Sequence, residues 1–376
     1  MELSIVDVAY GKGAGVARTP EGVVFVPGAF TGERVEAEIT QRKKHFATAK
    51  LTRILEPSTD RIAPETEVVP GMVYAELAYP AEVALKDLQL RTLLQRLGGL
   101  HDLAFLREPV GSPITHHYRN KLTLHWDGRR LGYIGEDNKT VIDTPQCPLS
   151  DPAINTTLTQ LRADRPLLKS LRPGTRLTFR ASPDGQVLMG TPPRGRIHEA
   201  IGDLHLDVAA DAFFQVNRAA TALLLDAFKA QVDGARRVFD LYCGCGLFGL
   251  AAAQAGAREI FGLEVTPSAI ESAKANAKHL GIAADYRCAP SEKLPANLPA
   301  ADLWVVDPPR DGLSEVVRQH LLTHRPARVA YISCGPDTLA RDLKALAPAY
   351  AIESMQLFDF FPRTAHFETL TFLTRT

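Results

Sequence analysis

Hydrophobic runs that alternate with turn and helix signals constrain this chain more than any other feature. Four such runs occur, at residues 237–242, 259–264, 303–307 and 328–333. Ala-rich or amphipathic stretches that favour helices follow three of these runs, and two prolines follow the run at 303–307. This rhythm is typical of a doubly wound, mostly parallel sheet, which binds ligands outside the carboxyl ends of its strands. The sequence therefore predicts a C-terminal α/β domain of Rossmann-like topology over residues 208–376.

Two different patterns precede this domain. Residues 1–57 contain about five short runs of alternating apolar residues separated by Gly, Pro and Thr-Gly turns, which predicts a small barrel of the oligonucleotide-binding type. Residues 58–207 begin with a proline-marked linker and a helix over 81–98, a candidate to pack on the C-terminal domain. Strand-like pieces follow, so the central part is predicted to be an α+β domain. The fold class is multidomain.

Composition excludes several classes of protein. Lys plus Arg and Asp plus Glu both number 43, so the formal net charge is zero and does not by itself indicate a nucleic-acid partner. A basic turn ending in an aromatic, at 41–46, suits either a base-stacking loop or a solvated hairpin tip. No apolar run approaches ~18 residues, and the N-terminus lacks a secretory pattern, so neither a membrane span nor secretion is expected. Five cysteines, an odd and sparse set, favour reduced thiols in the cytoplasm.

The turn after the first run carries three glycines, in Asp240-Leu241-Tyr242-Cys243-Gly244-Cys245-Gly246-Leu247-Phe248-Gly249. Glycine lets the backbone approach a ligand where a Cβ would clash, although the context is not that of the usual phosphate-binding loop. The next run ends in Glu264, whose carboxylate can accept both ribose hydroxyls or can simply be a solvated strand-end charge. Together these features fit S-adenosylmethionine. Cys243 and Cys245 lack a second pair, so we expect packing residues and no metal site.

Three more residues with useful chemistry flank strands. Asp307 opens Asp307-Pro308-Pro309-Arg310 after one run, Cys334 follows the next, and Glu368 begins the final strand. Because carboxyl ends of parallel strands meet at one edge, Cys334 is expected near Gly244, Glu264 and Asp307. A Cys just before a helix N-terminus is predicted to have a lowered thiol pKa. Taken singly, these residues also suit a Pro-rich strand exit, a packing Cys and an edge-strand charge.

These motifs, in this order and spacing, resemble the S-adenosylmethionine-dependent RNA (uracil-5-)-methyltransferases. The motifs concerned are Asp-Pro-Pro-Arg at 307–310, Ser-Cys-Gly-Pro at 333–336, Phe-Pro-x-Thr-x-His-x-Glu at 361–368 and Phe-x-Gln-x-Asn at 213–217. Residues 1–57 are similar to the TRAM domain, an oligonucleotide-binding barrel of the ribosomal RNA branch. The resemblance implies Cys334 as nucleophile and Glu368 as general base. It also implies cofactor contacts from Gln215, Tyr242, Gly244, Glu264 and Asp307.

The reaction implied by the resemblance explains these residue types. Thiolate addition to carbon 6 of uracil generates an enolate whose carbon 5 attacks the sulfonium methyl group, and a base then removes the carbon 5 proton. The uridine must be unstacked or lie in a single-stranded loop. We expect 23S ribosomal RNA as substrate, since transfer RNA relatives generally lack the barrel. The alternatives are a transfer RNA uridine, RNA cytosine-5 methylation, and an RNA-binding protein without activity; the last disagrees with the presence of both Cys334 and Glu368.

The chain departs from the family pattern at three places. Gly335 and Leu247 stand where relatives carry Asn, which predicts a looser Cys334 loop and one cofactor contact fewer. Many ribosomal RNA members bind an iron–sulfur cluster through four Cys, and here only Cys147 resembles a ligand, because residues 70–80 contain no Cys. We therefore expect no iron–sulfur cluster and a structural Cys147. Nothing in the sequence requires more than a monomer.

Overall fold

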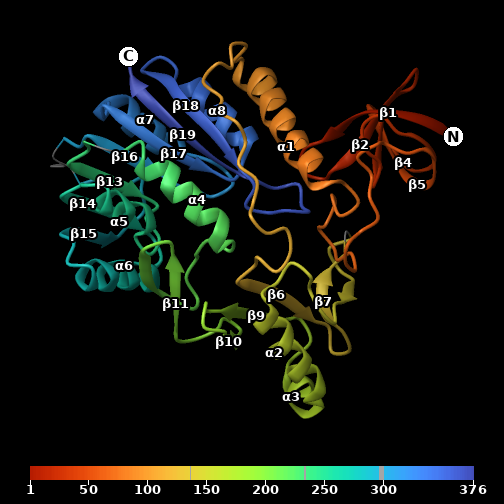
Figure 1. Cartoon of the computed structure of the whole chain (residues 1–376), viewed down its shortest axis with the longest axis horizontal. Helices are drawn as coiled ribbons and strands as arrows, with labels where there is room; N and C mark the ends of the chain where they lie inside the picture. Colours follow the sequence, from red (N-terminus) through yellow and green to blue (C-terminus); the bar gives the residue numbers. More distant parts are fainter. Residues whose placement is uncertain (136, 233, 296–299) are drawn as a thin grey trace. The chain divides into compact units, whose positions relative to one another are not determined.

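The computed structural model describes residues 1–135, 137–232, 234–295 and 300–376 (Figure 1). The chain forms two compact units. One contains residues 1–92 and 361–367, and the other contains residues 93–360 and 368–376. The division into three domains at 57 and 207 therefore stays a prediction.

The five strands at the N-terminus close into a barrel in the order β1-β2-β3-β5-β4, which confirms the barrel predicted from the sequence. The strands are β1 (Glu2–Ala9), β2 (Ala14–Thr19), β3 (Gly22–Pro27), β4 (Arg34–Arg42) and β5 (Phe46–Glu56). Buried and more exposed side chains alternate over part of β1, β3, β4 and β5, as a half-buried strand requires, whereas the first four residues of β2 are all buried. The inward set, which includes Ile5, Val26 and Val35, forms the barrel core.

A helix follows the barrel within the first unit. It is α1 (Tyr79–Leu93), and the chain continues as a π-helical turn (Leu94–Gly98) that ends at Gly99 with φ 69°. A left-handed residue at this place is the common way to end a helix, and glycine adopts it without strain. The π-helical turn belongs to the second unit, where it contacts α8 (Pro336–Leu346).

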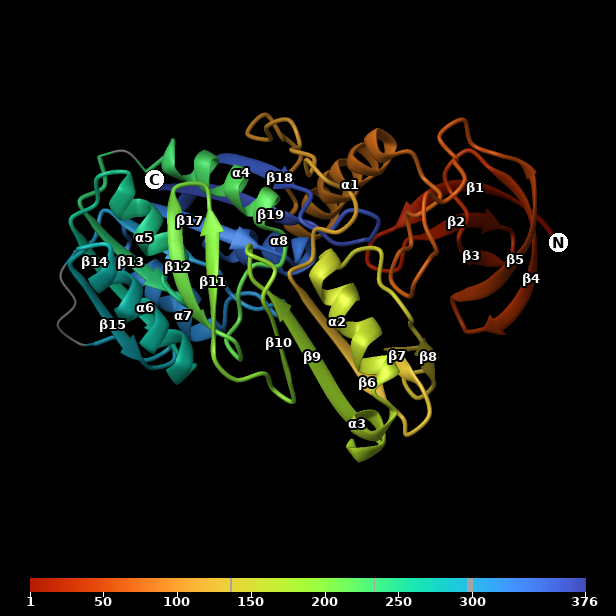
Figure 2. The ribbon, with the colours of Figure 1, turned by 60° about the horizontal axis from the view of Figure 1, so that its bottom comes forward.

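The second unit contains an antiparallel sheet of five strands in the order β10-β9-β6-β7-β8 (Figure 2). Its strands are β6 (Lys121–Trp126), β7 (Leu131–Ile134), β8 (Val141–Asp143), β9 (Thr175–Ala181) and β10 (Val187–Gly190). Two helices accompany it, α2 (Pro152–Ala163) and α3 (Arg165–Ser170), and α2 contacts β9 and β10. The hairpin of β11 (Arg196–Ile201) and β12 (Leu204–Ala209) follows.

A seven-stranded sheet carries the rest of the second unit, in the order β15-β14-β13-β16-β17-β19-β18. Its strands are β13 (Arg237–Leu241), β14 (Glu259–Glu264), β15 (Ala284–Cys288), β16 (Leu303–Val306), β17 (Arg328–Ser333), β18 (Tyr350–Phe358) and β19 (Glu368–Arg375). Its remaining helices are α4 (Arg218–Lys229), α5 (Leu247–Gln254), α6 (Pro267–His279) and α7 (Glu315–His324). The first five strands in this order are parallel, and β19 runs antiparallel to both of its neighbours.

The strand order identifies where a ligand would bind. The chain proceeds from β13 through β14 to β15 in one direction and then from β16 to β17 in the other, so the order reverses between β13 and β16. Open α/β sheets bind ligands at the carboxyl ends of the strands that flank such a reversal. None of the helices in the described residues is both long and apolar enough to cross a bilayer.

Candidate active site

The sheet gathers most of the predicted site residues at one edge. Tyr242 and Gly244 follow β13, and Glu264 ends β14. Asp307 follows β16, whereas Cys334 follows β17. Because these four strands are parallel neighbours, their carboxyl ends form the edge that the reversal of strand order identifies.

The glycine-rich loop after β13 is an open cradle. Tyr242 and Gly244 have left-handed backbones, with φ of 72° and 53°, and the amide of Tyr242 donates to Leu263 O at 2.9 Å. A Cβ added at Gly244 would meet nothing within 4 Å, so the space above this residue is free for a ligand. The carboxylate of Glu264 accepts the amides of Gly244 (3.2 Å) and Thr266 (2.8 Å). These bonds orient the carboxylate and leave lone pairs for further donors.

Two buried groups beneath this loop were missed by sequence reasoning. Asp240 is fully buried and accepts the amide of Gly249 at 2.8 Å. Burial, with a smaller effect of Glu264, raises the pKa of Asp240 to about 7. The ring of Tyr286 fills the neighbouring space, and a Cβ at Gly262 would lie 2.4 Å from it. A lone glycine inside a hydrophobic strand is the signal that could have revealed this close approach.

Strand pairing brings Cys334 and Glu368 together from distant parts of the chain. In the antiparallel pair β17–β19, Ser333 lies opposite Thr369, and the Thr369 hydroxyl donates to Ser333 O at 3.2 Å. Cys334 directly follows Ser333 and Glu368 directly precedes Thr369, so the two residues adjoin the last pair of the β17–β19 ladder at the same end. The charge of Glu368 acts on the pKa of Cys334, in agreement with this proximity. Glu368 is buried and Cys334 is half-buried, so the thiol and the carboxyl lie together in a site of low polarity.

Burial and like charges dominate the electrostatics of this pair. Burial and the carboxylates of Glu368 and Asp307 raise the pKa of Cys334 to about 12, against a smaller opposite effect of Arg310. Burial and Asp307 raise the pKa of Glu368 well above its usual range, again opposed by Arg310. The predicted lowering of the Cys334 pKa is therefore wrong. The positive end of α8 is outweighed by desolvation and by two neighbouring carboxylates.

Asp307 extends the group of carboxylates at the edge. Burial raises the pKa of Asp307 to about 8, and Asp240 and Glu264 add to the effect. Arg310, three residues further along the same loop, is exposed and is the only cation in the described chain that acts on the pKa of both Cys334 and Glu368. The edge therefore gathers several carboxyl groups whose ionised forms burial disfavours and a positively charged ligand would stabilise.

Gln215 lies in the segment between β12 and α4 and is buried. Its carbonyl accepts the side chain of Asn120 at 3.1 Å. Two residues later, Asn217 caps α4 by accepting the Ala220 amide, and it donates to Phe360 O at 3.1 Å. Within the described chain, no hydrogen bond joins Gln215 to the other predicted site residues, so its cofactor contact stays a prediction.

The departures from the family pattern have structural counterparts. A Cβ at Gly335 would lie 2.7 Å from the Thr338 hydroxyl oxygen and 3.0 Å from Arg310 O, so the loop as it stands excludes a side chain there. Leu247 is buried at the start of α5. The looser loop and the missing cofactor contact stay predictions.

Cys147, Cys243 and Cys245 are packing residues. Cys243 and Cys245 are buried, and burial raises the thiol pKa of Cys245 to about 12. Cys147 is also buried, with its sulfur 3.2 Å from the hydroxyl of Tyr133. Among the residues that the structure describes, no three His, Cys, Asp or Glu side chains gather in a way that would hold a metal ion. The expected lack of an iron–sulfur cluster stays a prediction.

Comparison with known proteins agrees with this arrangement. The TRAM domain family matches residues 1–52, the ribosomal protein L11 methyltransferase family matches residues 209–306, and the tRNA (uracil-5-)-methyltransferase family matches residues 300–376. RNA methyltransferases of Thermosynechococcus vestitus and Synechocystis are each 31% identical to this chain. The alignments cover 100% and 99% of this chain and 98% and 95% of theirs. The chain belongs to the RNA (uracil-5-)-methyltransferase family.

The family assignment confirms the fold class and the cofactor. The crystal structure of the tRNA (uracil-54, C5)-methyltransferase of Pyrococcus abyssi, in complex with S-adenosyl-L-homocysteine, superposes with a TM-score of 0.80 at 22% identity, over 100% of both chains. The tRNA (uracil(54)-C(5))-methyltransferase of Schizosaccharomyces pombe is 27% identical over 97% of this chain and 76% of its own. The enzyme uses S-adenosylmethionine. The residues fit it, since open space above Gly244 and the oriented carboxylate of Glu264 adjoin an edge rich in carboxylates.

Proposed function

We propose that the enzyme methylates carbon 5 of a uridine in RNA, with Cys334 as nucleophile and Glu368 as general base. The observation that supports this proposal is the β17–β19 register: Cys334 and Glu368 adjoin its last pair, Ser333 and Thr369, and Asp307 acts on the pKa of both. A pyrimidine placed there would meet a sulfur for carbon 6 and a carboxylate for the carbon 5 proton.

The proposed cofactor contacts are Gln215, Tyr242, Gly244, Glu264 and Asp307. Glu264 would accept the ribose hydroxyls with the oxygens that the Gly244 and Thr266 amides orient. When bound, S-adenosylmethionine supplies an electrophilic methyl group and one positive charge. That charge complements the carboxylates at the edge, which burial alone disfavours in their ionised forms.

In the first step, the thiol of Cys334 gives its proton to solvent and the sulfur forms a bond to carbon 6. The electron pair of the carbon 5–carbon 6 double bond moves to the carbonyl oxygen at carbon 4, which produces an enolate with a nucleophilic carbon 5. Because the pKa of Cys334 is raised to about 12, few thiols are ionised near neutral pH. Arg310, which opposes that rise, favours the thiolate.

In the last step, the carboxylate of Glu368 takes the proton from carbon 5. The electron pair of that bond restores the double bond, and the carbon 6–sulfur bond breaks to release Cys334 as a thiolate. A general base works best when its pKa lies near the working pH. Burial raises the pKa of Glu368, so its carboxylate binds a proton more strongly than that of an exposed glutamate.

The barrel supplies the proposed grip on RNA. Phe46 is 36% exposed at the end of the basic turn, with its ring against Phe25 and the Lys43 ammonium 5.5 Å above it. An exposed aromatic in a basic turn suits stacking on an unpaired base. The TRAM match over residues 1–52 supports the same role.

A uridine of 23S ribosomal RNA is the substrate we propose first, and a transfer RNA uridine is the second candidate. The second is favoured by the names of the Pyrococcus abyssi and Schizosaccharomyces pombe relatives, which match this chain over its full length or nearly so, barrel included. The barrel therefore does not distinguish the two substrates. We further propose a cytoplasmic monomer, in line with the five unpaired thiols.

The test compares Cys334→Ala with Cys288→Ser, a control at an exposed thiol. We expect Cys334→Ala to bind S-adenosylmethionine in calorimetry and to transfer no labelled methyl group to 23S or transfer RNA transcripts, whereas the control retains activity. Turnover by Cys334→Ala would rule out nucleophilic catalysis. Mapping 5-methyluridine in RNA of a strain lacking the gene decides the substrate: a loss confined to transfer RNA selects the second candidate, and no loss rules out both.

A further inference from the structure

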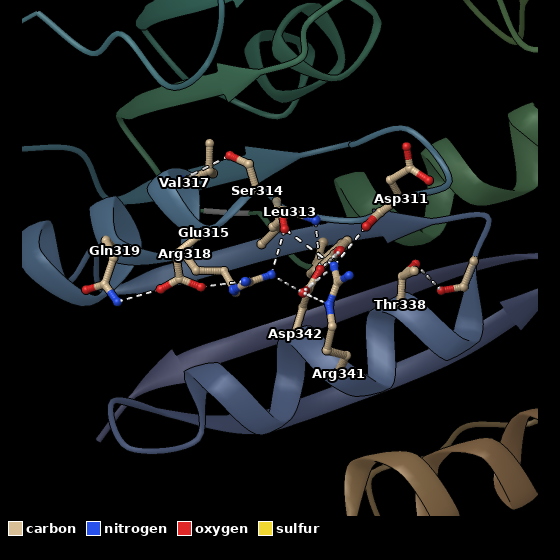
Figure 3. A network of polar contacts seen from close by, with 12 residues as sticks. Asp311, Leu313, Ser314, Glu315, Val317, Arg318, Gln319, Thr338, Arg341 and Asp342 are labelled. Atoms are coloured by element: carbon tan, nitrogen blue, oxygen red, sulfur yellow. Dashed lines mark hydrogen bonds and ion pairs between the residues drawn. The ribbon is translucent and has the colours of Figure 1, made fainter.

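A buried carboxylate outside the proposed catalytic residues organises the loop that carries Asp307 and Arg310. Asp342, on α8, is fully buried. One oxygen accepts the Leu313 amide at 2.7 Å and the Tyr331 hydroxyl at 2.8 Å. The other accepts the guanidinium groups of Arg318 at 2.8 Å and Arg341 at 2.9 Å (Figure 3). A buried charge with four good partners is a rigid feature, since removal of the carboxylate leaves several donors unpaired.

The partners of Asp342 also hold the backbone of the loop. Arg318 donates to Leu313 O at 2.7 Å, and Arg341 donates to Asp311 O at 2.8 Å. Thr338, one turn earlier on α8, donates to Arg310 O at 3.0 Å. Side chains of α8 therefore hold the loop at Arg310, Asp311 and Leu313.

The same helix begins at Pro336, two residues after Cys334. The Thr338 hydroxyl bonds both Gly335 O, at 2.9 Å, and Arg310 O. Helix α8 thus connects the loop with the thiol to the loop with Arg310, the cation that acts on both Cys334 and Glu368.

We propose that Asp342 is a positioning residue, which fixes the segment from Asp307 to Leu313 on α8 and so holds Arg310 beside Cys334. It does not touch the reacting atoms and acts through the loop. The importance of this positioning for methyl transfer rests on the proposed function.

The test measures the thiol directly and needs neither RNA nor turnover. The alkylation rate of Cys334 by iodoacetamide is followed by peptide mass spectrometry from about pH 7 to pH 10, around the ordinary thiol pKa. The variants are Asp342→Asn, Arg341→Met, Arg310→Gln and the double variant Asp342→Asn with Arg310→Gln. Arg341 is 49% exposed, so its variant remains informative if Asp342→Asn does not fold.

Glu315→Gln is the matched control. Glu315 is an exposed partner of the same Arg318 and makes no bond to the loop backbone. The Glu315→Gln substitution removes one carboxylate from the network without releasing the segment before Leu313.

We expect Asp342→Asn to slow alkylation of Cys334 at a given pH by about threefold, which corresponds to a rise of half a pKa unit. Arg341→Met is expected to act in the same direction and Glu315→Gln to match the wild type. In the Arg310→Gln background, Asp342→Asn is expected to add nothing, because both changes act through one cation.

Three results would overturn the proposal: an unchanged alkylation profile with only a lower melting temperature, an equal effect of Asp342→Asn in the Arg310→Gln background, or an equal effect of Glu315→Gln. If Asp342→Asn does not fold, an alkylation profile of Arg341→Met equal to that of the wild type also overturns the proposal. Methylation by Cys334→Ala would refute the proposed function and leave these alkylation results interpretable.

Discussion

Replacement of Glu368 by Gln is expected to make Cys334 more reactive while it blocks turnover. Cys334 and Glu368 adjoin the Ser333–Thr369 pair at the end of the β17–β19 ladder, and the Glu368 carboxylate raises the pKa of the thiol. Glutamine keeps the size of the side chain and removes the charge. A change that harms catalysis and yet speeds the chemistry of the nucleophile is hard to explain by damage to the fold.

The structure bounds the magnitude. Two unit charges about 5 Å apart at an effective dielectric constant of about 20 interact by about 3 kcal/mol, equivalent to about two pKa units. The pKa of Cys334 rises from an ordinary value of 9.0 to about 12, and burial is the largest cause of the rise. Glu368 therefore accounts for less than the full Coulomb figure. We expect a fall of about one pKa unit, or about tenfold faster alkylation at a fixed pH.

The assay has two readouts on the same variant. Iodoacetamide alkylation of Cys334 reports the pKa of the thiol, and denaturing gels with substrate RNA report the covalent adduct. Because the variant lacks the base for the carbon 5 proton, the adduct is expected to accumulate. Glu353→Gln, at an exposed glutamate paired with Arg328 on the same sheet, is the control and is expected to change neither readout.

Two results would refute this reasoning. Alkylation no faster than in the wild type would mean that the carboxylate of Glu368 does not act on the sulfur of Cys334. Normal product release without an adduct would mean that another group removes the proton.

Two further predictions concern the glycine-rich loop. Glu264→Gln replaces one acceptor for the amides of Gly244 and Thr266 by a donor, so we expect at least about tenfold weaker binding of S-adenosylmethionine in calorimetry; unchanged binding would exclude Glu264 as a cofactor contact. The pKa of Asp240 is raised from 3.8 to about 7 in the folded chain, so the stability it contributes is complete below about pH 4 and is lost as the pH rises through about 7. Asp240→Asn keeps an acceptor for Gly249. We expect the change in the free energy of unfolding caused by this substitution to be more favourable at pH 8 than at pH 4, by up to about 4 kcal/mol. An equal change at both pH values would contradict the raised pKa of Asp240.

Much of the fold was predictable because local patterns encode it. The hydrophobic runs at 237–242, 259–264 and 328–333 correspond to β13, β14 and β17, and the alternation in residues 1–57 corresponds to the barrel strands. The edge that carries Glu264 and Cys334 follows from one general property of parallel sheets. Motif order then indicated the family.

Other features depend on contacts between residues far apart in the sequence. Cys334 and Glu368 lie close together because β19 inserts between β17 and β18. No local pattern specifies the β17–β19 register. The motif at 361–368 is also divided, since Phe361–Phe367 belongs to the first unit and Glu368 to the second.

The pKa of Cys334 shows the physical reason most clearly. Sequence position relative to α8 suggested a lowered pKa, because a helix dipole is a local property. Desolvation and the charges of Glu368 and Asp307 act through space and together outweigh Arg310, so the pKa is raised instead. Secondary structure and motif order are determined by residues that are close in the sequence. The acidity of a buried thiol depends on which distant groups the folded chain places around it.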